Sequence, residues 1–352
     1  MDQDDVLQRP LVAVVVLSWN GRHFMERFLP SMTSLTYQPL DIYVADNASA
    51  DDTLDFLKSR YPDVKCIAIP KNEGFAKGYN TALKQIVADY YVLVNQDVEL
   101  APGFLEPLLD LMESDVNIAA CQPKILSESN RNMFEHAGAG GGYIDKYGYV
   151  FCRGRLFDTI EPDEGQYNDT HEIFWASGAA MCVRAELFHR FKGFDADYFA
   201  HMEEIDLCWR WKRAGYKIMY VPESVAFHVG GGSLSQDSPF KIYLNFRNNL
   251  FMLFKNMESQ DLIWKLPVRI VLENVAFFHA LFNRRWKEAG AIFRADWRFY
   301  ITIPLQLRKR FTNWLIYNRN RVDQSRVKKS GYYNKSIVWQ FFAKGKKVFR
   351  DL

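Results

Sequence analysis

The sequence contains few cysteines, and none of them is spaced as a metal-binding or redox pair. The five are scattered, odd in number and form no CxxC motif: Cys66, Cys121, Cys152, Cys182 and Cys208. Zinc knuckles and disulfide frameworks need closely spaced or paired cysteines, so neither is expected. This usage favours a reducing compartment, and we therefore expect a cytoplasmic protein.

The chain also lacks a long hydrophobic run and a targeting segment. A membrane-spanning helix needs about 20 mainly apolar residues, and the run from residue 11 to residue 17 is too short for this. The first residues are acidic, with Asp2, Asp4 and Asp5, whereas a signal peptide opens with basic residues. We expect no spanning helix, and we interpret the run as a buried strand.

The net charge is small, but acidic and basic residues are unevenly distributed. The 352 residues have a formal net charge of +2. Residues 257–352 contain 20 Lys and Arg against 7 Asp and Glu, whereas the remaining residues contain 24 against 35. An acidic front and a basic rear predict different partners for the two parts.

Strand and helix patterns alternate in the first hundred residues. Four apolar segments are typical of strands, at Val12–Leu17, Asp41–Ala45, Val64–Ile69 and Tyr91–Val94. Helical patterns follow the first three of them, with Ser49 and Asp52 as capping candidates for the second helix. The alternation predicts an α/β, Rossmann-like fold with a mostly parallel sheet flanked by helices. Such sheets bind ligands beyond the carboxyl ends of their strands.

Polar residues follow each of the four predicted strands. The clusters are Ser18-Trp19-Asn20-Gly21, Asp46-Asn47-Ala48-Ser49, Lys71-Asn72-Glu73-Gly74 and Asn95-Gln96-Asp97. A single cluster would be ordinary loop composition. Four clusters at a shared sheet edge indicate a binding site.

Several residues of these clusters have both a chemical and a structural interpretation. Asp97 can bind a hard divalent cation that bridges a diphosphate, or it can cap a helix. Asp46 can accept hydrogen bonds from a nucleotide base, or it can shape the turn before a helix. The stretch from Asn72 to Asn80, with Gly74, begins a helix whose N-terminus would favour phosphate, or it is a glycine turn. It matches neither a Walker A loop nor a GxGxxG fingerprint.

An acidic cluster later in the chain is the best candidate for base chemistry. Glu203, Glu204 and Asp206 lie within four residues, and ionised carboxylates this close need a metal, a basic neighbour or raised pKa values. The alternative is a solvated helix start, where acids favour the helix dipole. His228 precedes the run Gly230-Gly231-Gly232-Ser233, so a metal or phosphate role competes with a structural one.

From about Pro239 the sequence becomes helical, aromatic and basic. The segment Asp261–Asn283 is strongly apolar, but Lys265, Arg269 and Glu273 interrupt it, so a spanning helix is not expected. Aromatic residues further on interleave with Lys and Arg, at Trp286, Phe293, Trp297, Phe299, Trp314, Trp339 and Phe342. This composition suits an interfacial helix on an anionic membrane surface. The alternative is packing on the catalytic domain or on a second copy of the chain, and no nucleic acid partner is expected.

Seven stretches of the chain, taken in order, resemble one protein family. They are VVVLSWNG, VADNASADDT, NEGFAKGYN, VLVNQDVEL, FWASGAAMCVRAELF, GFDADYFAHMEEIDLCWRWKRAGY and FHVGGGS. Together they resemble the inverting glycosyltransferases of family 2, which have the GT-A fold. Within that family they are most similar to the bacterial rhamnosyltransferase-like enzymes of cell-surface polysaccharide synthesis. The resemblance covers residues 12 to about 235.

The resemblance implies a role for each candidate residue. The nucleotide-sugar donor would be bound by Ser18, Trp19, Asn20, Asp46, Asn72, Gly74, Asn80, Asn95 and Gln96. Where the family often has Asp-x-Asp, Asp97 keeps the metal-binding acid and Asn95 replaces the first one. His228 would complete a site for Mg²⁺ or Mn²⁺. The acceptor sugar would lie near Trp175, Ser177, Gly178 and Asp206.

The resemblance also implies the reaction. Glu203-Glu204 stands where the family usually has Glu-Asp, and because the second acid is normally the base, we assign Glu204 that role with Glu203 as the alternative. The expected reaction transfers a sugar, with inversion, from a dTDP- or UDP-sugar such as dTDP-rhamnose to a hydroxyl of a glycan or lipid-linked acceptor. A sugar nucleotidyltransferase and a non-catalytic nucleotide-sugar-binding protein are the alternatives.

The expected organisation is a catalytic domain followed by a helical basic region. We place the catalytic domain at residues 1–238, with its nucleotide-sugar half at about 10–100 and its acceptor half at about 101–238. Residues 239–352 would form the helical region. Because a lipid-linked acceptor is held at the membrane, we expect peripheral attachment at the inner face of the cell membrane, with a homo-oligomer as the other use of the apolar surface.

Overall fold

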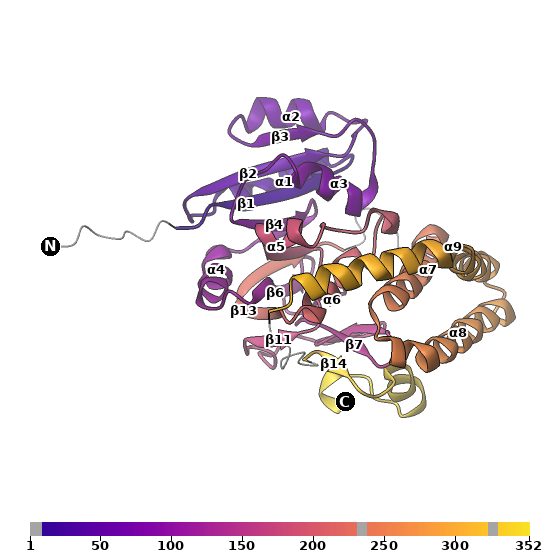
Figure 1. Cartoon of the computed structure of the whole chain (residues 1–352). Helices are drawn as coiled ribbons and strands as arrows, with labels where there is room; N and C mark the ends of the chain where they lie inside the picture. Colours follow the sequence, from indigo (N-terminus) through magenta and orange to yellow (C-terminus); the bar gives the residue numbers. More distant parts are fainter. Residues whose placement is uncertain (1–8, 231–237, 323–329) are drawn as a thin grey trace.

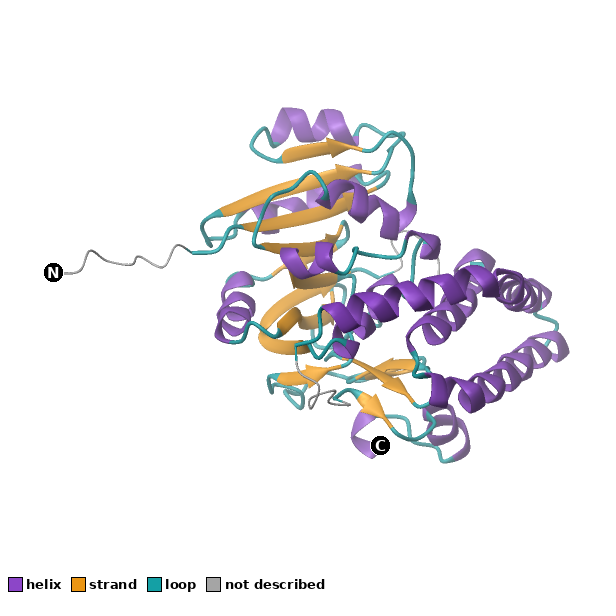
Figure 2. Cartoon of the chain, in the orientation of Figure 1, coloured by secondary structure: helices purple, strands orange, loops and turns teal. Residues whose placement is uncertain are grey.

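The computed structural model describes residues 9–230, 238–322 and 330–352. Within these ranges the chain forms a large β-sheet and a smaller one, with helices packed around them (Figures 1 and 2). The long C-terminal helices extend to the side of the molecule that is opposite the N-terminus (Figure 1).

The first part of the chain alternates strands and helices, as the sequence pattern predicts. The elements are β1 (Val12–Ser18), α1 (Arg22–Thr33), β2 (Leu40–Asp46), α2 (Thr53–Arg60), β3 (Lys65–Ala68), α3 (Gly74–Leu83) and β4 (Tyr90–Asn95). β1 pairs in parallel with β2 and β4, so Leu17 lies opposite Ala45 on one side and Asn95 on the other. The predicted α/β fold is confirmed, and the carboxyl ends of these strands meet at one edge.

Burial explains why these segments form these elements. Residues 12–16 are fully buried, which accounts for an uninterrupted apolar run in place of alternation, because helices cover both faces of a parallel sheet. Helix α1 buries Met25, Phe28, Leu29 and Met32, a spacing that places all four on one helical face. Asp52 occupies the N-cap position of α2, as one of the two predicted candidates, but the side chain that accepts the hydrogen bond from the Thr53 backbone N–H is that of Asp51.

The remaining strands of the large sheet bring later segments to the same edge. The elements are β5 (Val98–Leu100), α4 (Leu105–Ser114), β6 (Ile118–Ser127), β11 (His171–Ile173), β12 (Ala180–Arg184) and β13 (Lys217–His228). The strand order is β11-β13-β6-β12-β4-β1-β2-β3, with β5 paired to β13. β12 is antiparallel to β4, so its first residue Ala180 lies opposite Val94 near the end of β4. His228, the last residue of β13, lies opposite Val98.

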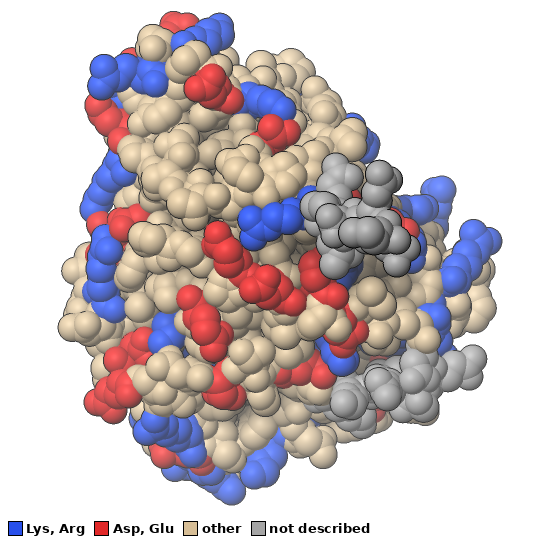
Figure 3. Space-filling view, turned by 90° about the vertical axis from the view of Figure 1, so that its left-hand side faces the viewer, with Lys and Arg blue, Asp and Glu red and all other residues tan. Residues whose placement is uncertain are grey.

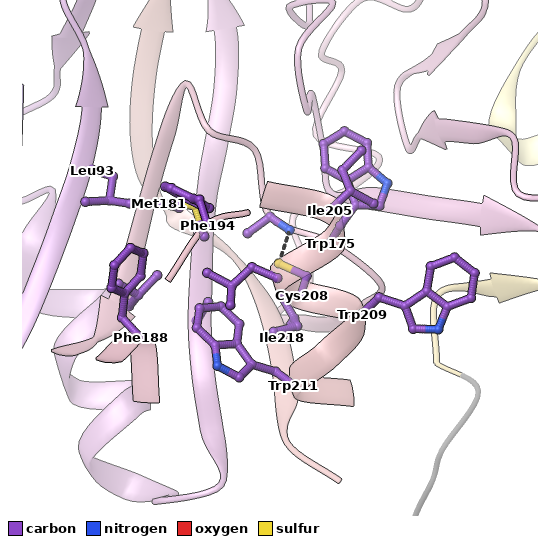
Figure 4. Packing of buried hydrophobic residues seen from close by; sticks show 14 of the residues in the cluster. Leu93, Trp175, Met181, Phe188, Phe194, Ile205, Cys208, Trp209, Trp211 and Ile218 are labelled. Carbon is purple, nitrogen blue, oxygen red and sulfur yellow. Dashed lines mark hydrogen bonds between the residues drawn. The ribbon is translucent and has the colours of Figure 1, made fainter. Parts of the chain in front are cut away.

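The core beside β12 joins the sheet to α6 (Glu203–Arg213), the helix that begins with the acidic pair. Met181 of β12, Phe194 and the fully buried Trp211 of α6 belong to one cluster of buried hydrophobic residues (Figure 4). The sulfur of Cys208 accepts a hydrogen bond from the Ala176 backbone N–H at 3.5 Å. Apolar packing therefore fixes α6 against the segment that leads into β12.

The Gly-rich middle of the chain forms the smaller sheet. Its strands are β7 (Gly142–Asp145), β8 (Val150–Cys152), β9 (Arg155–Leu156), β10 (Thr159–Ile160) and β14 (Tyr332–Tyr333), in the order β10-β9-β8-β7-β14. Strand β14 comes from the end of the chain, and Ile337 and Phe341 pack on Phe151 and Leu156. The region 239–352 is therefore not helical throughout, because its last residues complete a sheet of the preceding part.

The remaining helices lie in the second half of the chain, on both sides of the acidic cluster in the sequence. They are α5 (Ala185–Arg190), η1 (Ala196–Tyr198), α7 (Pro239–Asn256), α8 (Ser259–Phe282), α9 (Trp286–Arg319), η2 (Trp339–Ala343) and η3 (Phe349–Asp351). No helix in the described ranges combines the length and apolar character that crossing a bilayer requires.

Candidate active site

Asp46 lies at the carboxyl end of β2 with one carboxylate oxygen engaged by the protein. Its Oδ2 accepts a hydrogen bond from the Ser49 backbone N–H at 3.1 Å. Its Oδ1 is buried and has no hydrogen-bond partner in the described part of the chain. Because a buried acceptor without a partner costs free energy, this oxygen is suited to a donor on a ligand, such as an N–H of a nucleotide base.

Gln96 joins the ends of β4 and β1. Its Oε1 accepts hydrogen bonds from the Ser18 hydroxyl at 3.1 Å and from the Trp19 backbone N–H at 3.0 Å. Asn20, at φ 49°, accepts a hydrogen bond from the Ala50 backbone N–H at 2.7 Å. Ser18, Gln96 and Asn20 therefore shape the loop, and the Trp19 side chain, 45% exposed, is left at the surface.

The N-terminus of α3 is engaged by the protein and not left open for phosphate. The backbone N–H groups of Phe75 and Ala76 donate to the Phe199 carbonyl at 2.6 and 3.1 Å. The Gly74 N–H donates to Oδ1 of Asn72 at 2.9 Å. A side chain at Gly74, where φ is +73°, would collide with the Phe199 ring. Because Phe199 occupies these donors, the structure favours the glycine-turn interpretation of this stretch, and contact of Asn72 and Gly74 with the donor stays a prediction.

The side chain of Asn80 also makes hydrogen bonds within the protein. Its amide donates to the Phe194 carbonyl at 2.7 Å and accepts from the Phe194 backbone N–H at 3.0 Å. The side chain therefore ties α3 to the segment before η1. Contact of this amide with the diphosphate, as the resemblance implies, is not compatible with these two bonds.

Asp97 and His228 meet at the end of the large sheet. Nε2 of His228 lies 3.2 Å from Oδ1 of Asp97, and both side chains are buried. The pairing of β5 with β13 produces this contact, because it places His228 opposite the residue that follows Asp97. Asn95 ends β4, and its backbone N–H donates to the Ala179 carbonyl at 2.9 Å.

Glu135 is a third member of this group that the sequence did not point to. Its Oε2 lies 3.1 Å from Nδ1 of His228, so the imidazole lies between two carboxylates. Burial lowers the pKa of His228, but Asp97 and Glu135 outweigh this effect and raise it to about 10. Burial raises the pKa of Glu135, but the neighbouring His228 outweighs this effect and lowers it.

This pair offers the oxygen and nitrogen donors that a divalent cation takes, provided that the cation displaces the proton of His228. Two ligands at neighbouring corners of an octahedron, each about 2.1 Å from the metal, are about 3.0 Å apart. The 3.2 Å between Asp97 and His228 agrees with this spacing. Within the described residues no three or more His, Cys, Asp and Glu side chains form a metal-binding group, and a cation at a phosphate site commonly takes one or two protein ligands. Gly231, Gly232 and Ser233 lie outside the described residues.

The acidic pair begins α6 after a conformationally unusual segment. Phe199, His201 and Met202 have φ values of 66°, 69° and 73°, which non-glycine residues adopt at a cost and often at functional sites. Glu203 is 3% exposed, whereas Glu204 is partly exposed. One oxygen of each carboxylate is buried without a hydrogen-bond partner in the described residues.

The two carboxyl groups differ in their surroundings. Burial raises the pKa of Glu204 to about 7, and backbone N–H groups, including that of Gly178, limit the increase. Burial and the charge of Glu204 raise the pKa of Glu203 well above its ordinary value. A carboxyl group with a pKa near 7 can accept a proton at neutral pH, so Glu204 is the better placed base.

The predicted acceptor residues are only partly brought to the surface of the site. Gly178 lies beside Glu204 and Phe75. Trp175 is buried and donates from its indole nitrogen to the Tyr143 carbonyl at 2.9 Å. Ser177 donates from its hydroxyl to the Ala137 carbonyl at 2.7 Å. Trp175 and Ser177 therefore support the segment from within.

Asp206 is not available to an acceptor. It is fully buried, and Arg210 and Lys255 lie 3.0 Å from its two oxygens. Tyr198 and Asn256 also donate to it, at 3.1 and 2.7 Å. Burial raises the pKa of Asp206, but these cations outweigh it and lower the pKa. The prediction that Asp206 contacts the acceptor is wrong, because this carboxylate is a buried anchor between α6 and α7.

Asn248 of α7 is a further residue that the sequence did not reveal. It is fully buried, and its amide nitrogen donates to the carbonyls of Tyr198, Ala200 and His201 at 3.0, 2.8 and 2.8 Å. Arg247 donates to the Tyr198 carbonyl as well, at 2.9 Å. The helical region thus holds the segment that precedes the acidic pair, and no motif in the sequence marks this link.

Comparison with known proteins identifies the family. Residues 13–185 match a family described as glycosyl transferase family 2. This part of the chain is therefore a glycosyl transferase family 2 domain. This glycosyltransferase is 26% identical over 278 residues to an N-acetylglucosaminyl-diphospho-decaprenol L-rhamnosyltransferase of Mycobacterium tuberculosis, which covers 74% of this chain and 89% of the relative. It is 45% identical over 140 residues to the rhamnosyltransferase WbbL of Escherichia coli strain K12, covering 40% of this chain and 52% of the relative.

Solved structures share the fold of this glycosyltransferase. GalNAc-T7 with UDP, GalNAc and Mn²⁺ superposes with a TM-score of 0.55 at 14% identity, covering 72% of this chain and 48% of that one. The mannosyltransferase PcManGT of Pyrobaculum calidifontis, in complex with GDP-Man and Mn²⁺, gives 0.51 at 16% identity, covering 83% and 87%. The expected GT-A fold with a C-terminal helical region is confirmed.

Proposed function

We propose that this glycosyltransferase moves a sugar, with inversion, from a nucleoside diphosphate donor to a hydroxyl group of a lipid-linked acceptor. The observation that carries the proposal is the convergence of a base and a cation-binding pair at one sheet edge. The Asn95 backbone N–H donates to the Ala179 carbonyl, and the backbone N–H of Gly178, the residue before Ala179, acts on the Glu204 carboxyl group. Asp97 follows Asn95 by two residues, so the proposed base and the proposed cation-binding pair lie on neighbouring segments.

The residues divide the reaction between them. Asp46 binds the base, and Glu204 accepts the proton of the acceptor hydroxyl while that oxygen bonds to the anomeric carbon. The bond from that carbon to the diphosphate breaks in the same step, and the nucleoside diphosphate leaves with the electron pair. General base catalysis of this kind contributes about 10²–10⁴-fold, and no covalent intermediate is needed.

Asp97 and His228 would hold a divalent cation, Mg²⁺ or Mn²⁺. When bound, such an ion neutralises negative charge on the departing diphosphate. Glu135 keeps the His228 ring oriented toward Asp97. The names of two neighbouring structures record Mn²⁺ with a sugar nucleotide or its parts, which supports this proposal.

The donor and acceptor follow from the relatives by analogy. The mycobacterial relative is named for transfer of L-rhamnose to N-acetylglucosaminyl-diphospho-decaprenol. We infer a dTDP- or UDP-sugar, with dTDP-rhamnose as the first to test, and an acceptor on a lipid diphosphate for cell-surface polysaccharide. A lipid-linked acceptor would keep the enzyme at the inner face of the membrane as a peripheral protein.

The test is sugar transfer measured by mass spectrometry with a panel of nucleotide sugars and a short-chain lipid diphosphate acceptor. Transfer should stop in excess EDTA and return with Mg²⁺ or Mn²⁺. Asp97→Ala should lose most activity and, because it leaves the buried His228 without this partner, should unfold cooperatively at a lower temperature, whereas Asp110→Ala, on the remote helix α4, should change neither activity nor unfolding. Full sugar transfer in excess EDTA would refute the proposed dependence on a cation. Transfer of a nucleotidyl group without transfer of a sugar would refute the proposed reaction.

A further inference from the structure

Helix α8 has its charged face buried and its apolar face exposed. The buried side chains include Lys265, Arg269 and Glu273, which follow one another at intervals of four and so share one helical face. The opposite face exposes Ile263, Trp264, Val271, Val275, Phe278 and Phe282. A helix at the surface of a globular protein normally has the reverse arrangement.

Specific partners stabilise this inverted orientation. Lys265 lies 2.8 Å from Asp261 and donates to the Tyr332 hydroxyl at 2.9 Å. Arg269 pairs with Glu273 at 2.5 Å and lies 3.6 Å from the centre of the Tyr149 ring. These contacts hold the charged face of α8 in the interior. The apolar face, on the opposite side of the helix, is therefore exposed.

The exposed apolar side chains continue around the turn between α8 and α9. We define the hairpin tip as residues 277–294. Phe282 and Trp286 are 81% and 63% exposed, the rings of Phe278 and Phe282 are 6.3 Å apart, and those of Phe277 and Phe293 are 6.4 Å apart. Aromatic rings from both helices therefore gather at one end of the hairpin, which extends away from the rest of the molecule (Figure 1).

The hairpin tip is basic as well as aromatic. Arg284, Arg285 and Lys287 occupy the turn and the first residues of α9 and are all exposed. From residue 274 to residue 298 every exposed charged side chain is basic, and the two acids, Glu288 and Asp296, are only partly exposed, with Glu288 paired to Arg285 at 2.7 Å. The face of the molecule opposite the hairpin has Asp and Glu across its middle (Figure 3). Charged side chains are therefore unevenly distributed over the surface, and basic ones gather at the hairpin tip.

We propose that the hairpin tip inserts into the interfacial layer of an anionic lipid bilayer. Aromatic rings flanked by Lys and Arg suit the headgroup region, where the rings leave water and the cations meet lipid phosphate. The acidic face then points away from the anionic surface. An exposed apolar surface of this kind marks an interaction site in a folded protein.

A second copy of this chain would fit the hairpin tip poorly. The commonest dimers are symmetric and place the same patch on both sides of the interface. Such a dimer would bring Arg284, Arg285 and Lys287 against their own copies, and like charges repel at these distances. Lipid phosphate supplies the opposite charge and an apolar layer together.

The experiment is flotation of the full-length protein with vesicles of phosphatidylcholine alone or mixed with phosphatidylglycerol. Phe282→Ser with Trp286→Ser, both at exposed positions, should weaken binding to mixed vesicles about tenfold or more. Arg284→Asn with Lys287→Gln should weaken it about tenfold, and Asn is chosen because residue 284 has a φ of 56°. Val87→Ser with Val116→Ser, and Lys58→Gln with Arg60→Gln, are matched exposed controls that should bind as the unmodified protein does.

Each outcome decides the proposal. Loss of binding in the tip variants alone, together with release of the unmodified protein by salt, supports it. Binding of the tip variants at the unmodified level, or no binding of the unmodified protein to mixed vesicles, overturns it. A dimer in sedimentation that the tip variants convert to monomer also overturns it. The inference does not depend on the proposed reaction, because transfer to a water-soluble acceptor in the same preparations tests that reaction separately.

Discussion

Nδ1 of His228 lies 3.1 Å from Oε2 of Glu135, on the side of the ring opposite Asp97. A carboxylate in this position fixes the tautomer and the orientation of a metal-binding histidine and increases its basicity. Glu135 is itself held by the backbone, because its Oε2 accepts a hydrogen bond from the Ala137 N–H at 2.5 Å. The arrangement makes Glu135 a positioning residue behind the proposed cation site.

Glu135→Gln should weaken cation binding without removing a ligand. The amide keeps the size of the side chain but loses the charge that orients and polarises His228, so the Kd for Mn²⁺ should rise about 10–100-fold. Electron paramagnetic resonance of Mn²⁺ titrated in the presence of UDP or dTDP measures this directly.

Glu164→Gln is the matched control, since Glu164 is exposed on a loop and should leave the Kd unchanged. An unaltered Mn²⁺ affinity in the Glu135 variant would assign that residue to packing alone.

The parallel strands and the sheet edge where Asp46 and Asp97 lie could be predicted because their signal is local. The strands, the polar residues at their ends and the parallel order all follow from alternating apolar and helical segments between residues 12 and 97. Asp46 and Asp97 stand directly after buried strands, so the sheet alone brings them to one edge. Asp46 and Asp97 can therefore be identified as candidates from the sequence beside them, without knowledge of a contact to a distant segment.

The missed features depend on contacts between distant segments. Glu135 reaches His228 because a loop after β6 returns to β13, and Asn248 reaches the carbonyls before Glu203 from a helix of the C-terminal region. Asn80 and Asp206 were misassigned for the same reason. Their partners, Phe194 and Lys255, lie in segments whose proximity no local pattern reveals.

The two glutamates of α6 should differ strongly in their effect on the reaction. Glu204→Gln preserves shape and removes basicity, so kcat should fall about 10²-fold or more while the KM for the donor changes little. Glu203→Gln should cost much less, because Glu203 is 3% exposed, whereas Glu204 is partly exposed and can meet an acceptor. Initial rates with both variants at saturating donor give the comparison, and an inactive Glu203 variant beside an active Glu204 variant would reverse the assignment.

The pH dependence should report the Glu204 carboxyl group. Its pKa in the folded enzyme is about 7 because of burial, and only the deprotonated form can accept a proton. The value of kcat/KM should therefore increase with pH through about 7 and level off above it.

The profile is to be measured at saturating Mn²⁺ with a neutral acceptor analogue, so that neither cation binding nor acceptor titration contributes. Asp206 and Cys208 are two further titratable groups on the same helix. Burial raises the pKa of Cys208 to about 12, and the pKa of Asp206 is lowered, so neither changes charge near pH 7. A rate independent of pH between 5 and 9 would contradict Glu204 as the base.

Asn248 links helix α7 of the C-terminal region to the segment that precedes the proposed base. Substitution of its amide group tests whether this link affects the reaction. Asn248→Asp is the same size but replaces the donor with a carboxylate facing the carbonyls of Tyr198, Ala200 and His201. Losing these buried hydrogen bonds should lower the free energy of unfolding by about 1–3 kcal/mol. Because the segment sets the start of α6, kcat should fall more than the affinity for the donor. Urea unfolding, donor titration and initial rates separate these effects, with the exposed Asn274→Asp as control. Equal losses in stability and donor binding with an unchanged kcat would mean that Asn248 supports the fold and does not position the base.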